Sequence, residues 1–69
     1  MCLHLADIGT INTVKKVSGL SDVKKFLESL GIVIGARVTL VSSNNGNVIV
    51  DVKGSRVALS NEVAKKIFI

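Results

Sequence analysis

One segment of the chain, residues 21–30, carries apolar residues at the spacing of a single helical face. They follow the i, i+3, i+4, i+7 pattern and are Val23, Phe26, Leu27 and Leu30. Ser21 is placed to accept a hydrogen bond from a free amide of the first turn, and Asp22 lies where the helix dipole favours negative charge. Gly31 supplies the left-handed residue that ends a helix, and Ile32 then packs back on Leu27. We predict one amphipathic helix whose stripe faces the core.

Beyond Gly35 the apolar positions alternate with polar ones, which is the period of a half-buried strand. The alternating apolar residues are Val38 and Leu40, followed by Val48, Val50 and Val52. Between these two sets, Asn44-Asn45-Gly46 supplies residues that tolerate positive φ. The pattern predicts a β-hairpin with one buried face.

Turn and cap residues divide the C-terminal part of the chain into short pieces. Gly54-Ser55 turns the chain into a further strand over residues 56–59. Ser60 is placed to cap a short helical turn that runs to Lys66 and carries Val63 and Ala64 inward. Residues 67–69 are predicted as a final strand.

The N-terminal part is predicted to be extended, with one interruption. Residues 3–8 are expected to form a strand that runs into a single helical turn, which Gly9 ends. Residues 10–17 are rich in β-branched side chains and are bounded by glycine on both sides, as a strand would be. Their apolar residues recur every third position rather than every second, so this strand is expected to contain a bulge.

Several short strands and one helix within 69 residues favour a mainly β domain with short helices, built as a small closed or nearly closed barrel. We expect a single domain, residues 1–69, with a folded surface of about 4,200 Å². A core of this size leaves no room to enclose a substrate pocket of several hundred Å³, so the chain is not expected to be an enzyme. With 48% hydrophobic residues it should fold without a metal or disulfide.

The single cysteine, Cys2, cannot form an intramolecular disulfide, which favours a reducing cytoplasm. Residues 1–8 lack the basic start and the continuous apolar stretch of a signal peptide. The longest apolar run, residues 30–36, is far shorter than the roughly 20 residues that a membrane-spanning helix needs. These features predict a soluble cytoplasmic protein.

The candidates for metal or nucleophilic chemistry are few. Cys2 and His4 are the only soft metal ligands, with Asp7 as a third candidate, and nothing downstream completes a four-ligand zinc site. His4 is also the only imidazole, and no carboxylate is placed by the sequence to orient it or the thiol. No phosphate-binding glycine motif occurs. We predict no catalytic residues, no cofactor and no metal site, with Cys2 and His4 kept as candidates for transition-metal binding.

The net charge of +4 raises the alternative of nucleic-acid binding. The lysines, however, are dispersed in pairs, and the only aromatic residues, Phe26 and Phe68, fall at positions expected to be buried. A protein that binds single-stranded nucleic acid needs exposed aromatic side chains on which the bases stack. An SH3 domain that binds proline-rich peptides needs a groove lined by aromatic residues. The charge is therefore better explained by solubility or by attraction to an acidic protein surface.

The order of motifs along nearly the whole chain resembles the FeoA family. The residues that carry this resemblance are Leu5-Ala6-Asp7-Ile8, Val14, Gly19, Leu30-Gly31-Ile32, Gly35, Val38, Gly46, Val50, Gly54, Ala58-Leu59, Ala64 and Ile67. The Leu-Gly-Ile-x-x-Gly segment is the most specific part, and Gly-x-x-x-Ala-Leu supports it independently. The chain departs from the family pattern at Ile34, where proline is frequent, and at Gly19-Leu20, where a glycine pair is usual.

The resemblance implies an SH3-like barrel with extra helices, and a non-enzymatic accessory role in bacterial ferrous iron uptake. It implies contact with the FeoB membrane permease, which carries a GTP-hydrolysing domain. We expect the helix region and its adjoining loops to form the contact. The candidate residues are Leu20, Lys24, Lys25, Phe26, Leu30, Ile32 and Val33, with the two lysines steering toward an acidic surface.

Other functions are also compatible with the sequence. The same barrel occurs as the C-terminal domain of iron-dependent repressors, so the chain could be a freestanding relative that binds a regulator or nucleic acid. A role in activating GTP hydrolysis would require Arg37 or Arg56 to act as an arginine finger, although both fall in predicted strands. Exposed strand edges would also permit a homodimer.

Overall fold

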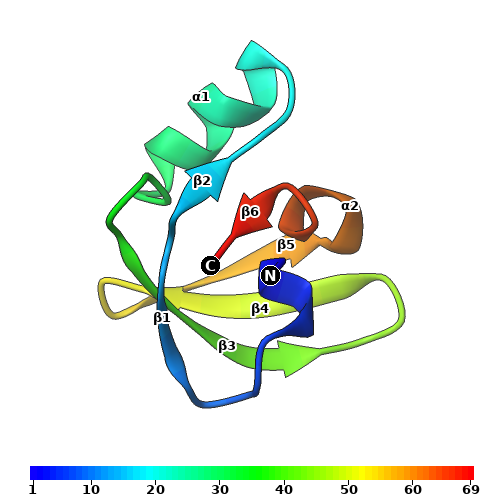
Figure 1. Cartoon of the computed structure of the whole chain (residues 1–69). Helices are drawn as coiled ribbons and strands as arrows, with labels where there is room; N and C mark the ends of the chain where they lie inside the picture. Colours follow the sequence, from blue (N-terminus) through cyan, green and yellow to red (C-terminus); the bar gives the residue numbers. More distant parts are fainter.

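The structure is a computed structural model that describes all 69 residues. The elements in chain order are η1 (Leu3–Leu5), β1 (Ile11–Thr13), β2 (Lys16–Val17), α1 (Ser21–Ser29), β3 (Arg37–Ser43), β4 (Asn47–Val52), β5 (Ser55–Ser60), α2 (Asn61–Ala64) and β6 (Ile67–Phe68). The accessible surface is 4268 Å², close to the value expected from chain length. Figure 1 shows α1 above the strands, with β2 and β6 beneath it.

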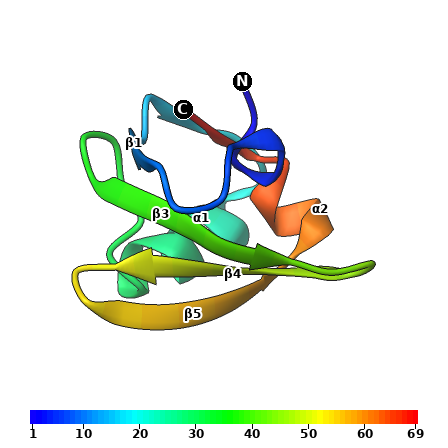
Figure 2. The same cartoon turned by 90° about the horizontal axis from the view of Figure 1, so that it is seen from below.

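The strands form two antiparallel sheets. One has the order β1-β3-β4-β5, and the other is the pair β2-β6. No strand ladder joins the two sheets into a closed barrel, and β5 remains at the outer edge of the larger one. Figure 2 shows β5 as the outermost strand, with no element drawn beyond it. The mainly β prediction is confirmed, and the sheet is open rather than closed.

The hairpin of β3 and β4 confirms the alternating pattern. Val48, Val50 and Val52 are each at most 2% exposed. Val50 and Val52 lie opposite the buried Leu40 and Val38 of β3. The pairing register shifts between Leu40 and Ser42, which marks a bulge in β3. The alternation thus places one face of the hairpin in the core.

The segment predicted as one bulged strand, residues 10–17, is two separate strands. β1 pairs with β3, whereas β2 pairs with β6 in the other sheet. The break lies at Val14, whose N–H donates to the carbonyl of Ala36 at 2.8 Å and whose own carbonyl accepts from Gly35 N–H at 2.8 Å. The chain changes sheets here because a loop far along the sequence takes the backbone hydrogen bonds of Val14.

The two ends of the chain lie side by side. Ile69 N–H donates to the carbonyl of Met1 at 2.8 Å, and Cys2 forms an isolated antiparallel bridge with Phe68. The N-terminal segment is therefore a single bridge followed by the 3-10 turn η1, rather than a full strand before the turn. This arrangement covers one side of the core with Leu3, which is 0% exposed.

The two helices begin differently from one another. Ser60 caps α2 as predicted, because its Oγ accepts from Val63 N–H at 3.3 Å. The predicted cap of α1 is wrong: Leu20 occupies the N-cap position, no side chain caps the helix, and Ser21 is its first residue. α1 therefore begins without a side-chain cap, directly after the extended Leu20.

Candidate protein-binding site

The end of α1 builds one wall of a groove. Gly31, with φ of 86°, donates its N–H to the carbonyl of Glu28 at 2.9 Å, and Ile32 N–H donates to Leu27 at 2.9 Å. This pair of bonds is the Schellman motif, which satisfies the free carbonyls of the last helical turn. The turn directs the Ile32 side chain into the core, where it is 1% exposed, and sends the next residues outward.

Val33 and Ile34 follow that turn with exposed side chains on a fixed backbone. They are 41% and 72% exposed. Ala36 N–H closes a turn by donating to the carbonyl of Val33 at 2.9 Å, and Gly35 N–H donates to Val14 at 2.8 Å. Since hydrogen bonds at both ends tie the loop to its neighbours, these apolar side chains are held in place for contact.

A groove of about 340 Å³ lies between α1, this loop and β2. Its lining consists of Val17, Lys24, Glu28, Ile32, Val33 and Ile34. The floor is apolar, because Ile32 is buried and Val17 is half-buried. Lys24 and Glu28, one helical turn apart on α1, form a charged rim. The groove is open to solvent and is therefore suited to a side chain of another protein rather than to an enclosed substrate.

Two more apolar residues of the α1 region are exposed, both outside the lining of the groove. Leu20, at the N-cap, is 76% exposed, and Phe26 is 50% exposed. The prediction that Phe26 is buried is wrong, because the nine-residue helix α1 buries only Leu27 completely. Val23 and Leu30 pack against the core in part. Phe26 projects from the side of α1 opposite the lysine and glutamate that line the groove, because positions two residues apart lie about 200° apart around a helix. Single exposed apolar side chains of this kind are ordinary.

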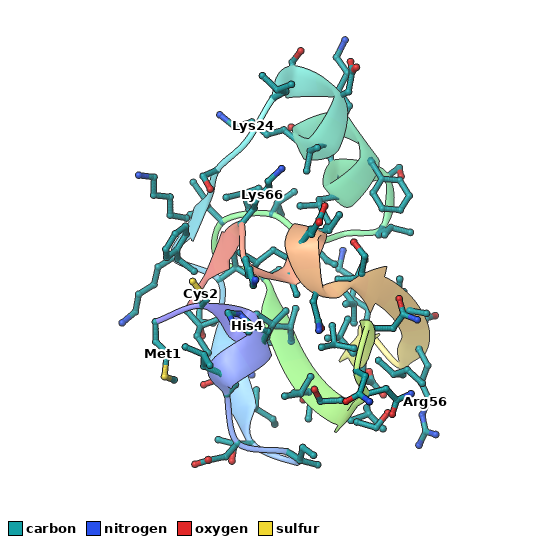
Figure 3. The ribbon with its side chains drawn as sticks, turned by 90° about the vertical axis from the view of Figure 1, so that its right-hand side faces the viewer. Met1, Cys2, His4, Lys24, Arg56 and Lys66 are labelled. Atoms are coloured by element: carbon teal, nitrogen blue, oxygen red, sulfur yellow. The ribbon has the colours of Figure 1, made fainter.

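The charges near this region are mostly lysines. Lys24 and Lys25 are both exposed on α1. Lys66 packs its stem against the backbone of Gly19, where an added Cβ would lie 2.9 Å from the Lys66 Cδ atom. Figure 3 shows Lys24 and Lys66 on neighbouring elements, α1 and the segment leading into β6. The groove itself is lined by one lysine and one glutamate, and the other lysines lie outside its lining.

The structure brings together only part of the predicted contact set. Lys24, Ile32 and Val33 line the groove, whereas Leu20, Lys25, Phe26 and Leu30 lie on or beside α1 outside its lining. The sequence analysis missed Val17, Glu28 and Ile34. The sequence did mark Ile34 as unusual, because an isoleucine stands there where the family pattern often has proline. Nothing in the sequence marked Val17, because only the pairing of β2 with β6 places it beside α1.

Cys2 and His4 are half-buried at the N-terminal segment, and Cys2 is a free thiol. The Nδ1 atom of His4 is buried without a hydrogen-bond partner. Figure 3 shows both side chains at the turn η1. The structure contains no group of three or more His, Cys, Asp or Glu side chains placed to hold a metal ion, so Asp7 does not complete a set with them.

Arg37 and Arg56 are exposed and lie in strands, Arg37 at the start of β3 and Arg56 in β5. Figure 3 shows Arg56 projecting from β5 away from the body of the molecule. Neither residue lines the groove. Neither helix has the length and apolar character needed to cross a bilayer.

Comparison with known proteins gives the family. The FeoA domain model matches residues 1–69. The chain belongs to the FeoA domain family. A relative in Methanocaldococcus jannaschii, provisionally named Fe(2+) transport protein A, is 36% identical over 67 residues, which cover 97% of this chain and 82% of that protein.

Solved structures confirm the fold of this FeoA protein. FeoA of Stenotrophomonas maltophilia, solved with zinc and described as a prokaryotic SH3 domain protein, is 27% identical with a TM-score of 0.86, covering 99% of this chain and 87% of that one. A manganese-dependent transcriptional repressor matches with a TM-score of 0.91 at 21% identity, and the chain covers 40% of it. The repressor likeness shows a shared fold alone.

Proposed function

We propose that this FeoA protein is a non-catalytic, cytoplasmic accessory of ferrous iron uptake that binds the cytoplasmic part of a FeoB-type permease through α1 and the loop after it. The observation that carries the proposal is the groove bounded by Lys24 and Ile34, with Leu20 exposed at the N-cap of the same helix. Membership of the FeoA family, with a relative named for Fe(2+) transport, supports the choice of partner.

The energetics favour a contact at this surface. Burying a leucine or isoleucine side chain that is exposed in the free protein contributes roughly 1.5–3 kcal/mol. Leu20 and Ile34 are 76% and 72% exposed, so both have most of this contribution available to a partner. Because the backbone of residues 33–36 is already hydrogen-bonded, little further ordering is needed on binding. The exposed Lys24 and Lys25 would mainly raise the association rate.

The test is a binding measurement between this protein and the purified cytoplasmic domain of the cognate FeoB, by interferometry, with and without guanine nucleotide. We expect Ile34→Ser and Leu20→Ser each to weaken binding about tenfold or more. Ile11→Ser is the matched control, since Ile11 is 67% exposed but lies on β1, outside the groove. Absence of binding at high micromolar concentration in every nucleotide state would overturn the proposal.

Two further experiments test the alternative hypotheses of GTPase activation and nucleic-acid binding. GTP hydrolysis by the FeoB domain is measured with a stoichiometric amount of this protein, and with its Arg37→Ala and Arg56→Ala variants. Unchanged turnover would exclude an activating role without affecting the docking proposal. A gel-shift series with DNA, from low to physiological salt, tests nucleic-acid binding, whose affinity would fall steeply as salt rises.

A further inference from the structure

The two-stranded sheet of β2 and β6 has an inner and an outer face. Val17 of β2 lies directly opposite Ile67 of β6, which is 0% exposed, so this pair is turned toward the core. Neighbouring residues of a strand point to opposite faces, and the next pair, Lys16 and Phe68, therefore projects outward. Solvent reaches this outer face, because Lys16 is exposed and Phe68 is half-buried.

Two more lysines extend the outer face. Lys15 is exposed as well, because two residues rather than one separate the buried Val14 from the inward Val17. Lys66 directly precedes the inward Ile67, so its side chain projects outward too. We call this surface the basic face, and it consists of Lys15, Lys16, Lys66 and Phe68.

The basic face carries three lysines and no acidic residue. The acidic residues nearest to it in the chain, Asp22 and Glu62, belong to α1 and α2. The lysines lie on or beside two strands of only two residues each, so their charges are concentrated in a small area. A surface of this kind is complementary to an anionic one.

The aromatic ring of the basic face is already in contact with a cation. Lys16 Nζ lies over the Phe68 ring, 5.9 Å from its centroid, which is a cation–π contact. A base that stacks on an aromatic side chain needs a free ring face. The basic face therefore offers positive charge without a free stacking platform, and this favours a surface of anionic headgroups over single-stranded nucleic acid.

An exposed apolar side chain borders the basic face. Met1 is 66% exposed, and its carbonyl accepts from Ile69 N–H at 2.8 Å, which holds it beside β6. Figure 3 shows Met1 close to Cys2, the residue that forms the bridge with Phe68. A bilayer interface accommodates an apolar side chain beside lysines, because the acyl boundary lies directly below the headgroups. The phosphates and sugars that proteins contact along a nucleic-acid backbone provide no such apolar layer.

We propose that the basic face binds the anionic surface of a lipid bilayer while the α1 groove holds the permease. The choice of a lipid surface rests on the proposed function, which places the protein at a membrane transporter. Anionic lipids give the cytoplasmic leaflet a negative surface potential that attracts lysines. The two contacts are compatible, because Val17 lines the groove whereas Lys16, its neighbour on β2, projects from the opposite face.

The lipid contact is expected to be weak by itself. Each lysine near an anionic bilayer strengthens binding roughly fivefold, so three lysines give an affinity on the order of 100-fold above that for a neutral bilayer. Stable attachment to a membrane usually takes two signals. The permease contact through the groove would be the second, and the lipid contact would orient the bound protein and raise its effective concentration at the permease.

The test is flotation of the full chain, without permease, with phosphatidylcholine vesicles that contain about 30% phosphatidylglycerol, compared with pure phosphatidylcholine. We expect binding to the anionic vesicles alone, and it should fall steeply between about 0.02 and about 0.3 M salt. With a paramagnetic chelate on the lipid headgroup, the NMR signals of β2 and β6 should broaden most. Absence of binding at low salt, or broadening centred on another element, would overturn the proposal.

A pair of double variants tests whether the basic face itself makes the contact. Lys15→Gln combined with Lys16→Gln should weaken vesicle binding about 10- to 30-fold. Lys53→Gln combined with Arg56→Gln removes the same charge from the β4–β5 hairpin and is the matched control, with an expected change of less than about threefold. Equal weakening in both would mean that net charge alone drives binding, and the assignment to the basic face would be wrong.

Two comparisons separate the proposal from its alternatives. Ile34→Ser, which should weaken binding to the isolated permease domain, should leave vesicle binding unchanged, because Ile34 belongs to the groove. Vesicle binding is measured without permease and permease binding without lipid, so either can fail while the other holds. If DNA of about 20 base pairs bound more tightly than the vesicles at equal phosphate concentration, the basic face would be assigned to nucleic acid instead.

Discussion

The amide of Ile32 donates a 2.9 Å hydrogen bond to the carbonyl of Leu27, and the side chains of these two residues are 1% and 0% exposed. One turn therefore ends α1, closes the core beneath it and sets the direction of the loop that follows. Because the Ile32 side chain points into the core, the side chains of Val33 and Ile34, which follow it, lie at the surface and line the groove. The groove depends on how the helix ends.

Gly31→Ala tests this dependence. Gly31 has φ of 86°, and a Cβ there would meet Val52 Cγ1 at 3.6 Å, so the main cost is the backbone conformation and not a clash. We expect a loss of about 1–2 kcal/mol in the free energy of unfolding, measured by urea denaturation. Gly46→Ala is the control, because Gly46 lies at an ordinary φ in open space. An equal loss in both variants would contradict the assignment.

Leu27→Ala and Phe26→Ala compare adjacent positions on α1. Leu27 is fully buried, so its truncation should cost about 2–5 kcal/mol through lost burial and the cavity left behind. Phe26 is 50% exposed, and its truncation should cost less than about 1.5 kcal/mol. Thermal melts of both variants decide the comparison, and a more damaging Phe26→Ala would refute the burial assignment.

Ser60→Ala should lower stability by about 0.5–2 kcal/mol, because it removes the side chain that accepts from Val63 N–H at 3.3 Å. Ser21→Ala, at the first residue of α1, removes no capping bond and should change stability by less than about 0.5 kcal/mol. Chemical denaturation midpoints of the two variants measure the difference. The reverse order would mean that α1, not α2, depends on its serine.

Lys53→Asn should stabilise the β4–β5 hairpin. Lys53 is the only non-glycine residue at positive φ, 54°, and it precedes Gly54, at φ 83°, in a two-residue turn. Asparagine tolerates this conformation better, and Asn-Gly is the preferred pair for such turns. We expect a gain of about 0.5–1 kcal/mol in the free energy of unfolding. Lys53→Val should have the opposite effect, and a gain from valine would argue against the turn geometry.

Much of the fold could be predicted because its signals are local. The alternation of valines in residues 48–52 fixed which face of β4 is buried, and the Gly31 turn and the Ser60 cap follow from residue chemistry at single positions. The break at Val14 could not be predicted, because it depends on hydrogen bonds to Gly35 and Ala36. Those partners are brought close only by folding.

The candidate site shows the same division. Periodicity placed Phe26 on the apolar stripe of α1, but it could not say how wide a face the core would cover. Ile34 was visible in the sequence as a departure from the family pattern, whereas Val17 became part of the groove only through the β2–β6 pairing. A local pattern identifies a face, and the neighbours of that face decide its exposure.

By itself the sequence determined the period of each element, the residues that end them and the family to which they belong, since each depends on short-range geometry or on motif order. Tertiary structure alone decided which strands pair, that the sheet stays open at β5 and that Leu20, Phe26 and Ile34 face solvent. The physical reason is that a core drawn from 69 residues is too small to cover every apolar side chain. Which residues remain uncovered depends on packing between segments distant in the chain.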